Sequence, residues 1–303
     1  MRSAARELSR FQDEPRQLPS GSFGKSAFLR LGFEPRADRT VLSTLHRRAP
    51  FIVQQALYWD EEMPGLPCVC MISNAGGVLQ GDRNRIEIDL APQSQAHVTT
   101  QSATRIQEMD TNHATQTQTI RLGANSYLEY IPHPVIPHRN SRFAQETLIE
   151  IDPTATLVYS EVLMAGRKYY GERGEVFAYD LFSSFVRAVR PGGRLLFAEK
   201  FVVEPGRGPV DVLGIMGPFH MFGNLIVLAP KPVVDTLFDA AAPTYDEALG
   251  VAFGASRLPN DAGVIVKALG MEAAPVVAVL REFWRQARLA ATGCALPDRF
   301  LWA

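Results

Sequence analysis

The 303-residue sequence has few cysteines, no surplus of charge of either sign and no long hydrophobic run. Three cysteines are too few, and odd in number, for a disulfide framework, which fits a reducing cytoplasm. With 31 basic and 32 acidic residues, no segment gathers enough Lys and Arg to bind a phosphate backbone or an anionic bilayer. No apolar run approaches the roughly 20 residues that a bilayer crossing needs. We therefore expect a soluble, cytoplasmic protein without a nucleic-acid or membrane partner.

The common signatures of nucleotide, acyl-enzyme and zinc chemistry are missing as well. The sequence has no Gly-x-x-x-x-Gly-Lys-Ser/Thr loop, no Gly-x-Ser-x-Gly elbow, no His-Glu-x-x-His and no Cys-x-x-Cys. The glycine cluster at 74–82 could be taken for a phosphate-binding loop, but it lacks the lysine and precedes a strand pattern. A sharp turn explains this cluster better, because glycine adopts positive φ without strain. These absences argue against an enzyme.

What is present is alternation of apolar and polar residues over most of residues 24–230. Ile86, Ile88 and Leu90 alternate with polar residues, and 115–122 repeats the pattern. Turn-forming Pro and Gly residues recur at short intervals between such runs. This pattern predicts a mainly β fold, a large antiparallel β-sandwich or β-stack of many short strands. Residues 1–23 lack the apolar stretch of a secretory signal and are expected to form a flexible tail.

The spacing of apolar residues changes after residue 230, where it becomes that of a helix. We expect helices at about 232–241 and 273–292, with Gly293 in the left-handed conformation that ends the second one. The last quarter is therefore predicted to be mostly helical. No internal repeat or low-complexity linker divides the chain, so 24–303 is expected to be a single β domain with C-terminal helices.

Two histidines lie in a proline-rich segment that should be stiff and extended. His133 and His138 could bind a borderline divalent metal ion, or each could hydrogen-bond a neighbouring carbonyl. His97 begins a run of hydroxyl-bearing residues that could line a polar passage or belong to an ordinary exposed strand. Cys68 and Cys70 could hold a soft metal or simply be buried under a sheet.

Three carboxylates lie within or beside strongly apolar stretches. Glu161, Glu172 and Glu199 must each find a cation, a hydrogen-bond donor or water, or take up a proton, if they are buried. They are therefore candidates for function, and a structural ion pair with Arg167 or Arg194 is the alternative.

Four motifs follow one another along the chain: Gly76-Gly77 with Gly81-Asp82, Val98-Thr-Thr-Gln-Ser-Ala-Thr104, Leu128-Glu-Tyr-Ile-Pro132, and Gly166-Arg167 with Gly171-Glu172. Each is weak singly, but in this order and at these separations they resemble the urease accessory protein family UreD, also called UreH. The resemblance covers roughly residues 24–299. The resemblance implies a mainly β, non-enzymatic protein that binds apo-urease, recruits a UreF-type protein and a UreG-type GTPase, and assists nickel insertion.

An internal route for the ion is also implied by this resemblance. Physically, such a route needs groups that bind Ni²⁺ weakly at successive points, since a tight cage would retain the metal. No permanently bound cofactor is then expected, only Ni²⁺ in passage. The hypothesised lining residues are Asp82, Thr99, Thr100, Glu161, Glu172, Glu199, His97, His133 and His138. Only Asp82, Thr99, Thr100, Glu172 and Glu199 lie on positions that match family motifs; the others come from chemistry alone.

Two alternatives belong to other classes of protein. A β-sandwich that binds a surface ligand such as carbohydrate would explain the strands, and it predicts an export signal and a flat aromatic platform. A metal-dependent hydrolase built on His133, His138 and a carboxylate predicts a tight site with one open coordination position.

Overall fold

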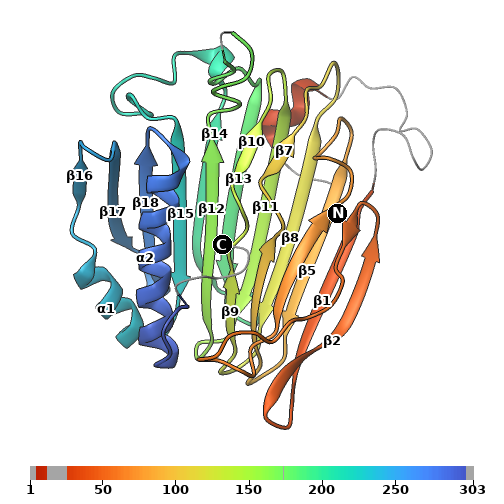
Figure 1. The fold of residues 1–303 in the computed structure, drawn as a ribbon, viewed down its shortest axis with the longest axis vertical. Helices are drawn as coiled ribbons and strands as arrows, with labels where there is room; N and C mark the ends of the chain where they lie inside the picture. The colour runs from red at the N-terminus through yellow and green to blue at the C-terminus, as the bar shows by residue number, and fades with distance from the viewer. Residues whose placement is uncertain (1–4, 12–25, 173, 298–303) are drawn as a thin grey trace.

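The computed structural model describes residues 5–11, 26–172 and 174–297, which form two β-sheets packed face to face (Figure 1). The smaller sheet contains β1 (Phe28–Arg36), β2 (Arg39–Arg48), β5 (Arg83–Leu90), β8 (Ala114–Leu122), β11 (Arg142–Ile151), β13 (Leu181–Val189) and β14 (Leu195–Val203). The larger contains β3 (Phe51–Ile52), β4 (Cys68–Ser73), β6 (Gln95–Thr100), β7 (Thr104–Ile106), β9 (Tyr127–Tyr130), β10 (Val135–Pro137), β12 (Thr156–Met164), β15 (Met221–Leu228), β16 (Thr244–Asp246), β17 (Val251–Arg257) and β18 (Gly263–Gly270).

Along the middle of the chain, successive strands alternate between the two sheets. Strands β5, β8, β11 and β13 therefore pair in parallel in the smaller sheet, as β4, β6, β9 and β12 do in the larger one. The prediction of a mainly β, two-sheet fold is confirmed, but antiparallel pairing is wrong for these strands. The reason is that period-two alternation reports which face of a strand is buried and is the same for either strand direction.

Antiparallel pairing is found at the margins of this parallel centre. It joins β1 to β2 and β13 to β14 in the smaller sheet, and β12, β15, β18 and β17 in the larger one. Figure 1 shows that the larger sheet extends past β14, which is one of the two edge strands of the smaller sheet.

Helices α1 (Lys231–Ala240) and α2 (Ala273–Thr292) pack on the outer face of the larger sheet (Figure 1). Both predicted helices are confirmed, and Gly293 has the left-handed φ of 74° that ends α2. The prediction of a mostly helical last quarter is wrong, since β16, β17 and β18 lie between the helices. Residues 263–266 of β18 are buried on both faces and form an uninterrupted apolar run, which hides the alternation.

The N-terminal residues do not all form a loose tail. Residues Arg6–Phe11 form a 3-10 helix, η1, on the outer face of the smaller sheet, with Leu8 packed against Ala144 and Leu181. Glu7 accepts a hydrogen bond from the Ser183 hydroxyl. The prediction of a flexible tail is therefore wrong for this part, and residues 1–4 and 12–25 lie outside the described residues. The two other 3-10 turns are η2 (Pro205–Arg207) and η3 (Pro259–Asp261).

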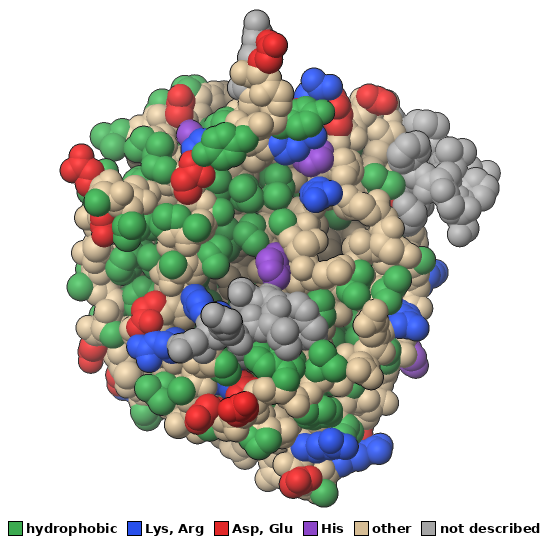
Figure 2. Space-filling model, viewed as in Figure 1, with side chains coloured by type: hydrophobic (Ala, Val, Ile, Leu, Met, Phe, Trp, Pro, Cys, Tyr) green, Lys and Arg blue, Asp and Glu red, His purple; other side chains and the backbone are tan. Residues whose placement is uncertain are grey.

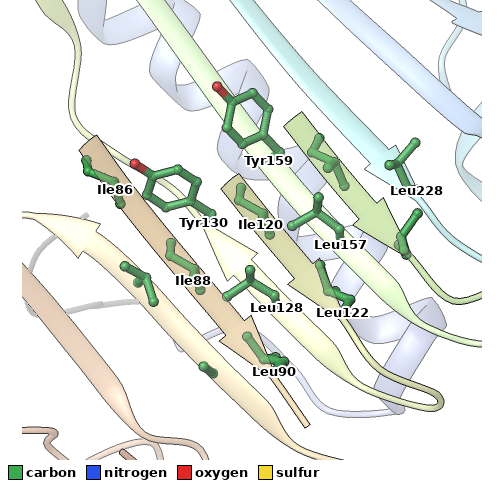
Figure 3. Close-up of a cluster of buried hydrophobic side chains, with 14 of the residues drawn as sticks. Ile86, Ile88, Leu90, Ile120, Leu122, Leu128, Tyr130, Leu157, Tyr159 and Leu228 are labelled. Carbon is green, nitrogen blue, oxygen red and sulfur yellow. The ribbon is translucent and has the colours of Figure 1, made fainter. Parts of the chain in front are cut away.

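One end of the space between the sheets is filled by aliphatic side chains (Figure 3). Ile88, Leu90 and Ile120 of the smaller sheet face Leu128 and Leu157 of the larger one, and all are buried. Figure 2 shows the molecule from the side on which α2 lies. On this surface, hydrophobic side chains are grouped over the region of β15, β17 and β18. Neither described helix has the length and hydropathy that a bilayer-spanning segment requires.

Candidate functional site

The other end of the space between the sheets is polar and contains a cavity of about 180 Å³. Figure 3 shows where the character changes: the hydroxyl groups of Tyr130 and Tyr159 point away from the aliphatic cluster. The cavity is lined from both sheets, and it reaches exposed residues at Gly76 and Ser102. Its polar lining includes Asn84, Thr100, Gln116, Gln118, Tyr130, His133, Gln145 and Glu161.

The amide side chains in this lining satisfy one another through the parallel register. Gln116 lies opposite Gln145, and Gln118 lies opposite Thr147, on the neighbouring strands β8 and β11. The Gln116 amide donates to Gln145 Oε1 at 3.1 Å, and the Gln118 amide donates to Thr147 Oγ1 at 3.0 Å. The Tyr130 hydroxyl donates to Gln118 Oε1. The parallel register of β8 and β11 thus aligns these side chains in a row of hydrogen bonds, which fixes their positions at this end of the interior.

Glu161 is the acid that lines the cavity, and the residue is half-buried. Its Oε1 accepts hydrogen bonds from Gln145 Nε2 at 2.8 Å, the Tyr159 hydroxyl at 2.9 Å and the Ser184 hydroxyl at 2.8 Å. Its Oε2 is buried and has no hydrogen-bond partner among the described residues. Burial raises the pKa of the Glu161 carboxyl, and the hydrogen bonds from Ser184, Tyr159, Gln145 and Asn224 lower it again only in part. No ion pair with a described residue neutralises this carboxyl, so it can accept either a proton or a cation.

His133 lies where the cavity meets a second, smaller one. It lines both the main cavity and a space of about 70 Å³ beneath α2. The prolines at 132 and 134 hold the segment extended, and the backbone N–H of His133 donates to Thr100 Oγ1 at 2.9 Å. Burial lowers the pKa of His133, which favours the neutral, metal-binding imidazole. Its Nδ1 is buried without a hydrogen-bond partner in the described part of the chain.

His97 and Thr99 lie on the opposite face of the larger sheet, under α2, and not in the cavity. His97 is fully buried, contacts Glu129 Oε2 through Nδ1 at 3.0 Å and stacks on Trp284. Thr99 donates to the carbonyl of Ile131 at 2.6 Å. The even–odd alternation of β6 sends Thr100 one way and its neighbours the other, so the sequence run could not line one passage. The alternative of an ordinary exposed strand is wrong as well, because His97 and Thr99 are both fully buried.

The charges near His97 form a buried network that fastens α2 to the sheet. Arg288 of α2 and Asp60 form an ion pair, both fully buried, and the Arg288 guanidinium also lies 3.7 Å from Glu129 Oε1. Burial acts to raise the pKa of Glu129, but His97, Arg288 and the Tyr127 hydroxyl outweigh it and hold the value below the usual range. Cys68 lies next to His97 in register, and burial raises its thiol pKa. Cys68 and Cys70 are free and buried, as the structural reading of these residues has it.

The remaining predicted residues are dispersed around the molecule. Asp82 is buried in the turn before β5, where its Oδ2 accepts the Leu79 N–H at 2.9 Å. Glu172 is exposed on a surface turn. His138 is buried near Arg167, and burial lowers its pKa. Glu199 forms an ion pair with Lys267.

The glycine cluster is the sharp turn that the sequence predicts. Gly77 has a φ of 142°, and a Cβ there would come within 2.6 Å of the Arg105 carbonyl oxygen. Its Gly76–Val78 part lines the cavity.

Of the nine predicted lining residues, the structure brings three to one cavity: Thr100, His133 and Glu161. Among the described residues, no three His, Cys, Asp or Glu side chains gather into a chelating group. The sequence reasoning missed the polar partners, above all Gln118, Gln145 and Tyr159. The available signal was Thr115-Gln-Thr-Gln-Thr119, which places two glutamines on the inner face of a buried strand.

Comparison with known proteins identifies the family. A family model described as UreD urease accessory protein matches residues 25–303. The chain is 69% identical to a protein of Brucella suis biovar 1 named urease accessory protein UreD 2, over the whole of both chains. It is 50% identical to a urease accessory protein UreD of Photorhabdus laumondii subsp. laumondii and 49% identical to one of Yersinia pseudotuberculosis, covering 98% of this chain and 92% of each relative. This chain therefore belongs to the UreD family of urease accessory proteins.

Proposed function

We propose that this chain serves urease maturation by letting Ni²⁺ pass through the cavity between its sheets on the way to apo-urease. The family supplies the role in maturation. The cavity, with one half-buried carboxylate residue and one half-buried histidine in its lining, supplies a place where the ion could be held briefly. We also propose that the chain is not an enzyme and is located in the cytoplasm. There it would bind apo-urease together with a UreF-type protein and a UreG-type GTPase.

The observation that carries the proposal is the Glu161 carboxyl, which lines the cavity without an ion-pair partner among the described residues. A carboxylate shielded from water and without a cation is costly, and the structure retains this one beside a polar cavity. Two or three weak protein ligands with water in the other positions suit an ion that must leave again. A closed set of four ligands would instead hold it.

The two alternative functions have no observation in their favour. His133 lines the cavity and His138 does not, so the pair required by a hydrolase is not assembled there. The family likewise does not support a surface-ligand module.

The test is co-expression of urease and its accessory proteins with Glu161→Gln in place of the wild-type chain. Glutamine keeps the volume and an oxygen acceptor for the hydrogen bonds from Gln145, Tyr159 and Ser184, but it removes the charge. We expect normal assembly of the accessory complex, with nickel per urease active site reduced about tenfold, the lower end of what loss of a metal-site group costs. The control is Glu172→Gln, which removes an exposed carboxylate and should leave the nickel content unchanged. Full nickel content with Glu161→Gln contradicts the proposal.

A further inference from the structure

The two edge strands of the smaller sheet, β2 and β14, differ in how their edges are protected. Strand β2 carries three exposed arginines, Arg39, Arg47 and Arg48. Charged side chains on an edge strand hinder the addition of a further strand. Strand β14 has two charged side chains, and each is held in an ion pair. Glu199 pairs with Lys267 of β18, and Lys200 pairs with Glu7 of η1. The apolar Val202 of β14, by contrast, is 41% exposed. The edge of β14 is therefore the less protected of the two.

This edge of β14 is covered at its beginning and accessible at its end. The side-chain amide of Asn260, in η3, donates to the Leu196 carbonyl at 2.8 Å. From Ala198 to Val203, the backbone hydrogen bonds to described residues are those to β13 alone. An edge strand presents a row of N–H and C=O groups to which another strand can bind. Residues 198–203 therefore offer such a row on the side that faces away from β13.

A groove of about 430 Å³ lies beside this part of β14. It is lined by residues 201–203 of β14 and by strands β17 and β18, which lie past β14 in the larger sheet (Figure 1). Phe253 of β17 packs on Phe283 of α2, on the opposite face of that sheet. The alternation of β17 therefore points Ala252 and Gly254 into the groove. These two side chains are small, so the floor of the groove is left uncovered.

The lining of the groove is apolar except for three side chains, Lys267, Tyr179 and His220. The ammonium of Lys267 is already paired with Glu199. The Tyr179 hydroxyl and His220 Nδ1 are buried and have no hydrogen-bond partner within the described part of the chain. Both rings lie edge to face with the ring of Phe177, at 6.4 and 6.3 Å between centroids, so they are neighbours. Buried polar atoms without a partner are rare in native folds, so these two call for one.

The chemistry of these two atoms fits a peptide group. Burial raises the pKa of the Tyr179 hydroxyl, which therefore stays protonated and can donate a hydrogen bond. Burial lowers the pKa of His220, so its ring stays neutral and its Nδ1 can accept a hydrogen bond. A peptide group has both a C=O acceptor and an N–H donor. A carboxylate ligand would instead require a free cation, and the lysine of this lining is already in an ion pair.

Charge argues against a second copy of this chain as the occupant. In an antiparallel pair, residues that lie opposite one another share a face of the sheet. Twofold pairing of two β14 strands about their middle would therefore place Glu199 opposite Glu199, or Lys200 opposite Lys200. Like charges in such positions are destabilising. A segment of a different protein avoids this repulsion.

We infer that residues 198–203 of β14 and the groove beside them bind an extended, uncharged segment of a partner protein by strand addition. The backbone of the segment pairs with β14, and its apolar side chains, at every second position, lie in the groove over Ala252 and Gly254. One of its amide groups is the partner of the Tyr179 hydroxyl and of His220 Nδ1. This inference rests on the proposed function only in that the chain binds other proteins, and it adds a surface and a mode of binding.

The main test is the variant Gly254→Leu, which fills the groove from its floor. A Cβ at Gly254 would meet only the Pro243 Cβ among the described residues, at 3.9 Å, an ordinary contact. Glycine within a strand is itself unfavourable, so we expect a melting temperature equal to or above that of the wild-type chain. The immobilised chain is then tested separately against the purified UreF-type protein, the UreG-type GTPase and apo-urease. For one of these, the dissociation constant should rise about tenfold or more.

The matched control is Thr119→Leu. It introduces the same side chain on the outward face of β8, since Ile120 next to it faces the core. It should bind all three proteins with the wild-type dissociation constants.

A second variant, Tyr179→Phe, tests the role of the unpaired hydroxyl. Because the hydroxyl has no partner in the free chain, its removal should not lower the melting temperature. The dissociation constant for the same partner should nevertheless rise about fivefold, the effect of one lost hydrogen bond. A wild-type dissociation constant would overturn the role given to Tyr179.

Amide hydrogen exchange tests the mode of binding. In the complex with that partner, amides of residues 198–203 should exchange about tenfold more slowly or less than in the free chain, while those of β2 should not change. Unchanged exchange in β14, or wild-type affinity of Gly254→Leu for all three proteins, would overturn the inference.

Two further outcomes separate the inference from its alternatives. Dimerisation of the wild-type chain that Gly254→Leu abolishes, measured by analytical ultracentrifugation, would overturn it, because a second copy would then be the occupant. Glu161→Gln should bind all three proteins as the wild-type chain does. Wild-type binding by Gly254→Leu together with poor nickel delivery by Glu161→Gln would overturn the inference and leave the proposed function intact.

Discussion

The two ends of the space between the sheets are built on the same strands but filled in opposite ways. The end that contains Leu90, Leu122 and Leu128 is aliphatic and closed. The end that contains Gln118, Gln145 and Glu161 is a hydrogen-bonded network around a cavity. The change occurs within single strands, since β8 carries Ile120 in one region and Gln118 in the other. The difference teaches that one length of a set of strands can form an apolar core while another length of the same strands lines a polar cavity.

The aliphatic end should be the more sensitive to truncation. Leu128→Ala removes a fully buried side chain that faces the smaller sheet, and we expect a loss of about 2–5 kcal/mol in the free energy of unfolding. Urea unfolding followed by circular dichroism measures it. A loss below about 1 kcal/mol would mean that this end is not the stabilising part of the interior.

The hydrogen-bonded network should show an intermediate effect. Gln118→Leu leaves the Tyr130 and Thr147 hydroxyls without their amide partner, which we expect to cost about 1–3 kcal/mol in the same measurement. A loss below about 0.5 kcal/mol would show that these two hydroxyls do not depend on the Gln118 amide.

Because of Glu161, the contribution of the polar end to the free energy of unfolding should depend on pH. Its folded-state pKa lies above the ordinary value of 4.5 because of burial, so folding favours the protonated form. That contribution is complete below the unfolded-state pKa and is lost as the pH rises through the folded-state pKa. Glu161→Gln has no carboxyl to titrate at this position. Its free energy of unfolding should therefore increase relative to that of the wild-type chain as the pH rises above 4.5. A difference that is constant with pH would contradict a raised pKa.

The smallest effect is expected outside both ends. Glu172→Gln changes an exposed carboxylate on a surface turn, and its unfolding free energy should stay within about 0.5 kcal/mol of the wild-type value. A larger change would show that Glu172 has a structural partner.

The sequence carried enough information for the class of fold but not for its topology. Alternation identified buried faces such as that of Ile86 and Ile88, and helical spacing found α2, because both are local patterns. Strand direction depends on which sheet the chain enters next, and no local pattern records it.

The candidate site was predictable only in part for the same kind of reason. Glu161 and His133 were identified from chemistry alone, since a carboxylate in an apolar run and a histidine between prolines are unusual. His97 and Thr99 were misplaced because their strand turns them towards α2, a contact made across 187 residues of sequence between His97 and Trp284. Asn224 gave no local signal, because its environment is created by β12 and β18 from distant parts of the chain.

The central claim is that the polar end conducts nickel and the aliphatic end does not. The most direct measurement is the rate at which apo-urease acquires Ni²⁺ from a preassembled accessory complex containing either the wild-type chain, Glu161→Gln or Leu128→Val. We predict a rate about tenfold lower for Glu161→Gln and an unchanged rate for Leu128→Val, although the latter is the less stable of these two variants. Equal rates for all three complexes would contradict the account.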